Sequence, residues 1–225
     1  MTTRMYLIRH GTTNLSAEDR FSGGTDVDLA DEGRWQADCL AKRLADDRIT
    51  AIYCSPMRRT LETATIIGKP YRFTPIPREG LREIHHGRWE TMQRSEVEET
   101  FPEEYAAWQE DPFTFAPSGG ESGVMVMARA LPVIREIVVN HTGETVAVVS
   151  HKATIRLIIS SLLGFDARGY RDRLDQSPAC LNILDFKDSV RVRLMLFNDV
   201  SHYADQPPYA QQRLSDWFDV KLTES

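Results

Sequence analysis

Arg9 and His10 stand directly after a run of four apolar residues, and Gly11 follows them. The apolar run predicts a short buried strand that begins at Met5, and the glycine predicts an abrupt turn where this strand ends. A permanently charged guanidinium beside an imidazole suits a small anion. A phosphoryl group is the obvious candidate, because arginine offers it a planar fork of donors. The same residues are equally compatible with a structural strand end that carries a solvated arginine and a hydrogen-bonded histidine.

A second histidine has a similar setting. His151 follows Ser150 and the β-branched segment 145–149, which predicts another buried strand. If the two strands are neighbours, His10 and His151 reach the same edge of a sheet, and this edge is where ligands bind in open α/β proteins. Two histidines and Arg9 on one point would disfavour one another's charged forms unless an anion joined them. The arrangement therefore predicts a phosphate pocket.

The composition favours one globular domain over residues 1–225 and argues against two classes of partner. Hydrophobic residues make up 41% of the chain, which suffices for one substantial core. The formal net charge is -6 at pH 7, so the chain lacks the basic excess that nucleic acids and anionic membrane surfaces attract. An acidic protein that binds an anion must gather its arginines and histidines locally.

Cysteine usage and hydropathy bear on location and on cofactors. Cys39, Cys54 and Cys180 are far apart and form no zinc-type cluster, so they predict reduced core thiols in a cytoplasmic protein. No apolar run approaches the roughly 20 residues of a membrane helix, and the chain starts without a signal-peptide segment. No aspartate cluster of metal-binding type accompanies the histidines. Neither a metal nor another cofactor is expected.

Alternating strands and helices predict an α/β fold with three layers, α/β/α, in which helices flank a mostly parallel central sheet. Strands are expected over residues 5–9, 49–54, 71–77 and 145–149, and an antiparallel hairpin over 180–186 and 190–197. Helices are expected over residues 31–47, from 55 onward, over 122–140 and over 152–163. Ser55 is the expected N-cap of the second helix, with Pro56 as its first residue. Pro132 is expected to kink or divide the long third helix.

Two segments lie outside this alternation. Residues 88–118 are acidic and aromatic, and they predict a small helical cap over the edge of the sheet. The aromatic side chains of the cap either line an apolar pocket or pack against the body of the protein. They are Tyr105, Trp108, Phe113 and Phe115. The tail, residues 204–225, has an apolar face that either covers a neighbouring subunit in a homodimer or docks on its own domain.

Six segments follow one another in an order that is typical of one enzyme family. They are Leu7-Ile8-Arg9-His10-Gly11-x-Thr13, Arg20-Phe21-x-Gly23-x-x-Asp26-x-x-Leu29, Ser55-Pro56-x-x-Arg59-x-x-x-Thr63-Ala64, Leu81-x-Glu83-x-x-x-Gly87-x-Trp89-Glu90, Gly119-Gly120-Glu121-Ser122 and Val149-Ser150-His151. This set resembles the histidine phosphatase superfamily, the phosphoglycerate mutase-like proteins, from Tyr6 to Tyr203. The resemblance implies a phosphoglycerate mutase-like fold. It is strongest to the phosphatase branch with broad-specificity and α-ribazole phosphatases.

The resemblance implies roles for five residues. His10 is the expected nucleophile, which becomes phosphorylated on nitrogen and so divides one hydrolysis into two easier steps. Arg9, Arg59 and His151 are expected to bind the phosphoryl oxygens. Glu83 is expected to protonate the leaving oxygen and then to activate water. The arginines and histidines supply the positive charge, so the implied activity is metal-independent hydrolysis of a small organic phosphate.

Substrate contacts are expected from the loop after the first strand and from the segment after His151. Ser22 and Gly23 lie in that loop, where Ser16 occupies a place that is often asparagine in the family. Lys152-Ala153 replaces a common Gly-Gly pair; Lys152 either adds charge at the rim or is solvated. The backbone amides of this pair are expected to point at the phosphate.

Three residues compete with the implied site residues. Arg58 and Arg59 project about 100° apart on a helix, so only one is expected to face the pocket, and the motif register favours Arg59. His85 and His86 follow Glu83 closely. Each either contacts the substrate or is a surface or hydrogen-bonded histidine, and the second role is favoured for both.

Three functions share these residues. A cofactor-dependent phosphoglycerate mutase carries a longer cap insertion than residues 88–118, and this short acidic cap suits a bisphosphate poorly. Hydrolysis is therefore favoured over the mutase alternative. A non-catalytic phosphate-binding module is the third possibility, and the joint presence of the site residues argues against it. Sugar phosphates, phosphoserine-like acids and nucleoside-like phosphates all stay open as substrates.

Overall fold

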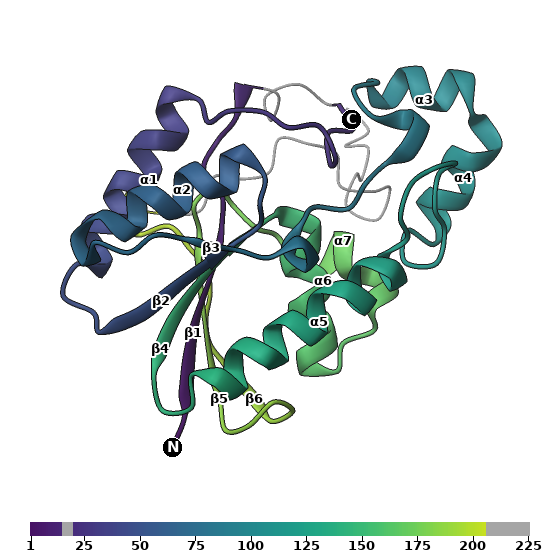
Figure 1. Ribbon diagram of the computed structural model, residues 1–225. Coiled ribbons are helices and arrows are strands. Elements are labelled where there is room, and N and C mark those ends of the chain that lie inside the picture. Colours follow the sequence, from purple (N-terminus) through teal and green to yellow (C-terminus); the bar gives the residue numbers. More distant parts are fainter. Residues whose placement is uncertain (15–19, 206–225) are drawn as a thin grey trace, which may run out of the picture.

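The computed structural model describes residues 1–14 and 20–205, so Ser16 and most of the tail lie outside the described residues. A six-stranded mixed sheet, in the order β3-β2-β4-β1-β5-β6, forms the centre of the molecule (Figure 1). The strands are β1 (Thr3–Arg9), β2 (Ile49–Cys54), β3 (Ile76–Pro77), β4 (Thr145–Ser150), β5 (Leu181–Phe186) and β6 (Val192–Asp199). The first four are parallel, and β5 and β6 form the predicted antiparallel hairpin at one edge.

Helices cover both faces of this sheet, which confirms the predicted three-layer α/β fold. In the described chain they are α1 (Asp31–Leu44), α2 (Arg58–Gly68), α3 (Arg94–Thr100), α4 (Pro102–Glu110), α5 (Gly123–Asn140), α6 (Lys152–Leu163) and α7 (Tyr170–Arg173). Helices α1 and α2 lie side by side on one face, and α5 and α6 lie on the other (Figure 1). None of these helices is both long and apolar enough to cross a membrane.

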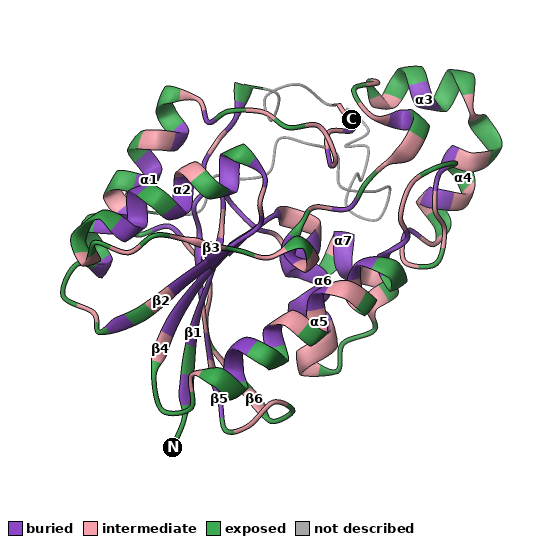
Figure 2. Cartoon of the chain, in the orientation of Figure 1, coloured by how far each residue is buried: buried purple, intermediate pink, exposed green. Residues whose placement is uncertain are grey.

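The central strands are apolar on both sides because each side meets a helical layer. Met5 and Leu7 of β1 belong to the core cluster that includes α5 and α6. Tyr6 and Ile8 point to the opposite cluster, which includes α1 and α2. This alternation explains why β1 and β4 are continuous apolar runs in the sequence, and Figure 2 shows most of their length as buried.

Three local expectations differ from the structure. Only Ile76–Pro77 of the expected strand 71–77 pairs with β2, and this short edge strand accommodates a proline that cannot donate to a ladder. Helix α2 starts at Arg58 with Met57 as its N-cap, so the predicted start at Ser55 and Pro56 is wrong. Helix α5 continues through Pro132, which is exposed, so solvent can hydrate the carbonyl that the proline leaves unpaired.

The predicted cap consists of α3 and α4, which stand apart from the sheet (Figure 1). Its core is an aromatic cluster in which Trp89 is fully buried, with Phe21, Tyr105 and Trp108 around it. The outer faces of both helices are exposed, as Figure 2 shows. The acidic side chains of the cap are mostly on these outer faces, because burying them without partners would be costly.

Candidate active site

Strands β1 and β4 are parallel neighbours, which is the condition under which the sequence placed both histidines at one edge of the sheet. Arg9 pairs with Ser150 across the two strands, so the residues that follow both leave from the same edge of the sheet. The ring centroids of His10 and His151 are 5.2 Å apart, with an angle of 63° between the ring planes. The two histidines are therefore neighbours at the carboxyl end of the sheet.

The imidazole of His10 is held in one tautomer. Its Nδ1 lies 2.7 Å from the carbonyl oxygen of Gly11, which can only accept, so Nδ1 carries the proton and Nε2 keeps its lone pair. The imidazole is buried. Burial, together with the charges of Arg59 and Arg9, holds the pKa of His10 well below its ordinary value. The structure thus presents a neutral, oriented nitrogen nucleophile.

Gly11 keeps this turn close to helix α1. A Cβ atom added to Gly11 would lie 2.4 Å from the carbonyl oxygen of Gly33, which no real side chain could tolerate. Its amide donates to the hydroxyl of Thr63 at 3.3 Å, and this contact ties the turn to α2. The Arg-His-Gly sequence therefore needs glycine for close packing at this point.

His151 is fully buried and is held by two side chains. Its Nδ1 accepts a hydrogen bond from Nε of Arg59 at 3.3 Å, so its Nε2 carries the proton and donates to the hydroxyl of Ser55 at 2.8 Å. Burial, followed by the charge of Arg59, places the pKa of His151 well below its ordinary value. Ser55 thus orients the second histidine, and the same hydroxyl also accepts the amide of Met57 at 3.4 Å, just before α2 begins.

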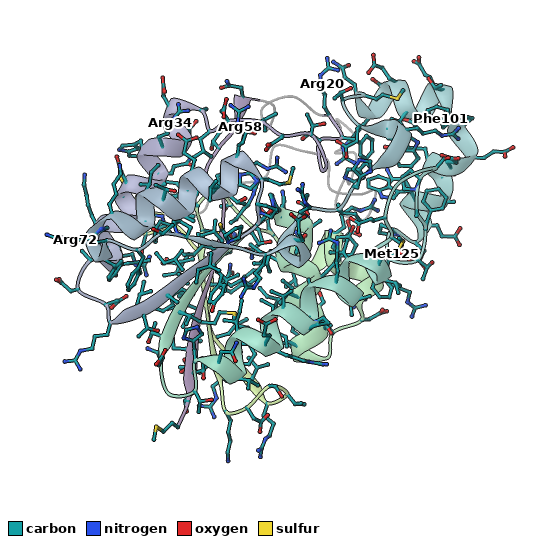
Figure 3. The ribbon with its side chains drawn as sticks, viewed as in Figure 1. Arg20, Arg34, Arg58, Arg72, Phe101 and Met125 are labelled. Atoms are coloured by element: carbon teal, nitrogen blue, oxygen red, sulfur yellow. The ribbon has the colours of Figure 1, made fainter. Side chains whose placement is uncertain are left out.

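Arg59, and not Arg58, faces the histidines. The Arg59 side chain is only 3% exposed, and it donates to the carbonyl oxygens of Thr25 at 2.8 Å and Gly23 at 3.0 Å. Arg58 is exposed at the start of α2 and pairs with Asp28, as its position in Figure 3 also shows. The one-residue difference on the helix separates the two side chains, as the motif register indicated.

Arg9 reaches the same place from the end of β1. Its Nη1 donates to the carbonyl oxygen of Gln176 at 2.6 Å, and its buried Nε has no hydrogen-bond partner in the described chain. Burial lowers the pKa of Arg9, yet a guanidinium stays protonated in proteins. A half-buried cation with a buried, unused N–H group beside two neutral histidines is an anion-binding arrangement.

Glu83 is fixed at the start of helix α6. Its Oε2 accepts from the amide of Ala153 at 3.0 Å, and its Oε1 accepts from the amide and the hydroxyl of Thr154 at 3.1 Å and 3.0 Å. A carboxylate at a helix N-terminus is favourable because of the helix dipole. The amide of Ala153 was expected to point at the phosphate; in this structure it binds Glu83.

A pocket of about 170 Å³ opens at this edge of the sheet. The predicted site residues that line it are Arg9, His10, Ser22, Gly23, Arg59, Glu83 and Lys152. His151 is absent from the lining, and it contacts the pocket through Arg59 and His10. Ser16 lies outside the described residues, so its expected contact stays a prediction.

The pocket also contains residues that the sequence did not single out. His86, expected at the surface or hydrogen-bonded, lines the wall, with a buried Nδ1 that has no partner in the described chain. Burial lowers the pKa of His86 to about 4. His85 is exposed, and its Nδ1 accepts a hydrogen bond from the amide of Gly87 at 2.9 Å. The His-His pair carried no signal to tell the two apart.

Basic residues on the far wall were missed as well. They are Arg20, Arg94, Arg156 and Arg171, and Tyr170 lies among them. Arg156 stands one helical turn after Lys152, so the spacing on α6 places both on one face. Burial and the nearby charge of Arg156 lower the pKa of Lys152 to about 7. For Arg171 the sequence offers no comparable signal, because its position depends on how α7 packs on the cap.

The sequence left two roles open for the aromatic residues of the cap, lining the pocket or packing against the protein, and the structure shows both. Trp108 lines the pocket. Tyr105 and Phe115 pack into the aromatic core of the cap, and Phe113 packs against the cluster around Leu157. The described His, Cys, Asp and Glu side chains form no group of three or more that could hold a metal ion.

Comparisons with known proteins agree with this geometry. A model of the histidine phosphatase superfamily (branch 1) matches residues 5–200. Phosphoserine phosphatase 1 of Hydrogenobacter thermophilus is 35% identical over 163 residues, which are 72% of this chain and 77% of the relative. A glucosyl-3-phosphoglycerate phosphatase of Mycolicibacterium vanbaalenii is 36% identical over 168 residues, 72% of this chain and 74% of the relative. The solved structure of Bacillus stearothermophilus YhfR superimposes with a TM-score of 0.82 at 33% identity, covering 89% of this chain and 98% of that one.

Proposed function

Because the chain belongs to the histidine phosphatase superfamily, we propose that it hydrolyses a small phosphomonoester through a phosphohistidine on His10. The observation that carries this proposal is the tautomer of His10. Its Nδ1 is engaged by the carbonyl oxygen of Gly11, which leaves the Nε2 lone pair free in a pocket that Arg9 and Arg59 also line. A nitrogen nucleophile beside fixed cations is suited to phosphoryl transfer.

In the first proposed step, Nε2 of His10 attacks phosphorus and the bond from phosphorus to the ester oxygen breaks. Arg9 and Arg59 bind the equatorial oxygens, on which charge is spread in the transition state. Glu83 gives its proton to the departing oxygen, so the alcohol leaves as a neutral molecule. His151 supports the clamp by accepting from Nε of Arg59.

In the second step, Glu83 takes a proton from a water molecule, whose oxygen attacks phosphorus. The phosphorus–nitrogen bond breaks, inorganic phosphate leaves, and His10 and protonated Glu83 return to their starting states. The two guanidinium groups supply the positive charge that a metal supplies in other phosphatases, and we propose metal-independent catalysis for this reason. Hydrolysis in the presence of a chelator tests this point.

The acidic composition of the cap was the reason to expect that the pocket suits a bisphosphate poorly, and the structure removes this reason. The acidic side chains of the cap are mostly on its outer faces, whereas Arg94 and Trp108 line the pocket. The charge of the cap therefore does not disfavour a bisphosphate. Hydrolysis is favoured instead by the short cap, and by two relatives that are named phosphatases. A relative in Arabidopsis thaliana, 32% identical, is named phosphoglycerate mutase-like protein 4.

The test is a rapid-quench experiment with a ³²P-labelled phosphomonoester. The wild-type protein is expected to form an acid-labile, base-stable phosphoprotein within the first turnover and then to release phosphate. His10→Ala is expected to lose both the phosphoprotein and about 10³-fold or more of the turnover. His85→Ala, an exposed histidine close in sequence to Glu83, is the matched control and should behave as wild type.

Three results would contradict parts of the proposal. Normal turnover by His10→Ala would exclude His10 as the nucleophile. Binding of phosphate without any phosphoprotein would support the non-catalytic binding module. Exchange between 2- and 3-phosphoglycerate that a bisphosphate primer stimulates, with little release of phosphate, would support the mutase.

A further inference from the structure

The pocket holds more positive charge than one phosphoryl group uses. Among the described residues, its lining contains seven cationic side chains and one carboxylate, that of Glu83. The cations are Arg9, Arg20, Arg59, Arg94, Lys152, Arg156 and Arg171. The proposed reaction assigns only Arg9 and Arg59 to the phosphoryl oxygens. In a chain with a formal net charge of -6, this concentration needs a reason of its own.

Arg171 lines the pocket and is held in place by contacts with the cap. It is 6% exposed, its Nη2 donates to the carbonyl oxygen of Gln109 at 3.1 Å, and its guanidinium lies 4.4 Å from the ring centroid of Trp108. Its Nε is 3.6 Å from the carboxylate of Asp172, which is too long for a hydrogen bond. Nη1 is buried and has no hydrogen-bond partner in the part of the chain that is described. A fixed, buried guanidinium with unused donors is costly unless a ligand accepts from it.

Arg156 repeats this pattern deeper in the pocket. It is 4% exposed, and its Nη2 donates to Asp175 at 2.9 Å. Lys152 uses the same carboxylate oxygen at 3.2 Å, so two cations share one acid. The Nε of Arg156 is buried without a partner among the described residues. Lys152 and Arg156 thus share the single charge of Asp175, and Arg156, like Arg171, keeps a buried N–H group that no described residue accepts.

We propose that the alcohol part of the substrate carries a second acidic group, a carboxylate or a second phosphate, and that Arg171 and Arg156 bind it. This inference rests on the proposed hydrolysis at His10. Arginine is suited to both acids because its planar fork matches two oxygens at once. The pocket volume of about 170 Å³ limits the alcohol to a small one. Arg171 and Arg156 are then specificity-determining residues at the end of the pocket that binds the alcohol.

The test compares matched substrates that differ only in the second acid. One pair is 3-phosphoglycerate and glycerol 3-phosphate, which differ in a carboxylate. The other is fructose 1,6-bisphosphate and fructose 6-phosphate, which differ in a phosphate. The wild-type protein is expected to show a kcat/KM at least about 10-fold higher for the acidic member of one pair, since a hydrogen bond to a charged group contributes about 1.5–3 kcal/mol. The pair that shows this preference identifies the acid.

Arg171→Gln is expected to reduce this preference ratio by about 10- to 100-fold, and Arg171→Lys to reduce it less. Arg173→Gln, an exposed arginine on the same short helix, is the control and should leave the ratio as it is. If Arg171 had a purely structural role, its substitution would lower kcat/KM for both substrates of a pair by the same factor, and the ratio of the two kcat/KM values would not change. That result, or a wild-type protein without preference in either pair, would overturn the inference.

The proposed function fails in a different way. If the wild-type protein releases no phosphate from p-nitrophenyl phosphate and forms no phosphohistidine, the hydrolysis itself is wrong. If it hydrolyses p-nitrophenyl phosphate but prefers neither acid, only the second anion site is wrong.

Discussion

The imidazole Nε2 of His151 lies 2.8 Å from the hydroxyl of Ser55, and both side chains are fully buried. The residues stand at the ends of adjacent parallel strands, β4 and β2. Nδ1 of the same ring accepts a hydrogen bond from Nε of Arg59. The hydrogen bond to Ser55 therefore fixes which ring nitrogen of His151 faces Arg59. Ser55 is therefore a positioning residue for the proposed chemistry.

Ser55→Ala should leave the buried Nε2–H of His151 without an acceptor. We expect the free energy of unfolding to fall by about 1–3 kcal/mol and kcat to fall about 10-fold, with a smaller change in KM. Chemical denaturation and steady-state kinetics measure both effects. Ser55→Thr keeps the hydroxyl and should recover part of kcat. A wild-type kcat in Ser55→Ala would show that this hydrogen bond does not serve catalysis.

Glu83→Gln should separate proton donation from helix capping. The amide oxygen of glutamine can still accept at the start of α6, whereas the side chain can no longer give up a proton at the ester oxygen. We expect kcat to fall about 10²- to 10⁴-fold for alkyl phosphates and much less for p-nitrophenyl phosphate, whose leaving group needs no proton. A series of aryl phosphates measures this dependence. Glu79→Gln, at an exposed position, is the control, and an equal loss on every ester would contradict the acid role.

The lowered pKa values of His10 and His151 predict that stability decreases toward acidic pH. In the unfolded chain both imidazoles titrate near 6.5, and in the folded chain the pKa is well below this value. Below pH 6.5 the unfolded chain therefore binds more protons, so the free energy of unfolding falls by up to about 1.4 kcal/mol per pH unit for each histidine.

Denaturation in phosphate-free buffer between pH 7 and pH 5 checks this dependence. His10→Asn removes one of the two groups, so its free energy of unfolding should change less steeply with pH than that of the wild type. The matched control is His85→Asn, at an exposed position. Equal slopes for the wild type and His10→Asn would mean that His10 titrates normally in the folded protein.

Gly11→Ala should disturb the nucleophile without removing any functional group. The new Cβ would lie 2.4 Å from the carbonyl oxygen of Gly33, so helix α1 or the turn must move. We expect a loss of about 1–3 kcal/mol in the free energy of unfolding and a reduced kcat. Gly169→Ala is a suitable control, because its Cβ would meet only the flexible side chain of Arg173. Wild-type stability and kcat in Gly11→Ala would contradict this role of Gly11.

The layers of the fold could be predicted because local patterns determine them. Ile49–Cys54 forms a strand at the predicted bounds, since Ile49 and the run from Ile52 to Cys54 are buried on a sheet with helices on both faces. The alternation indicated a parallel sheet but not its strand order, so the neighbouring positions of β1 and β4 were only a condition of the predicted site, which the structure meets. The short β3 was not predictable, because Tyr71 and Phe73 stack on each other and pack on the sheet without joining it.

A site residue could be predicted only where local geometry leaves one possible role for its side chain. Arg59 was separable from Arg58 by helical geometry, whereas Ser55 could cap a helix or bind a histidine, and the distant His151 decides between these uses. Arg171 lines the pocket because α7 packs beside Trp108 of the cap. No pattern within the sequence of α7 indicates this contact.

Trp108 and Arg171 belong to α4 and α7, whereas His10, Arg59 and Glu83 stand on the sheet edge, on α2 and at the start of α6. In the proposed assignment, Arg171 contacts the alcohol from α7, an element that carries none of the residues proposed to cleave the ester. Substitutions in α4 and α7 can change which compound is accepted while the cleaving residues keep their places.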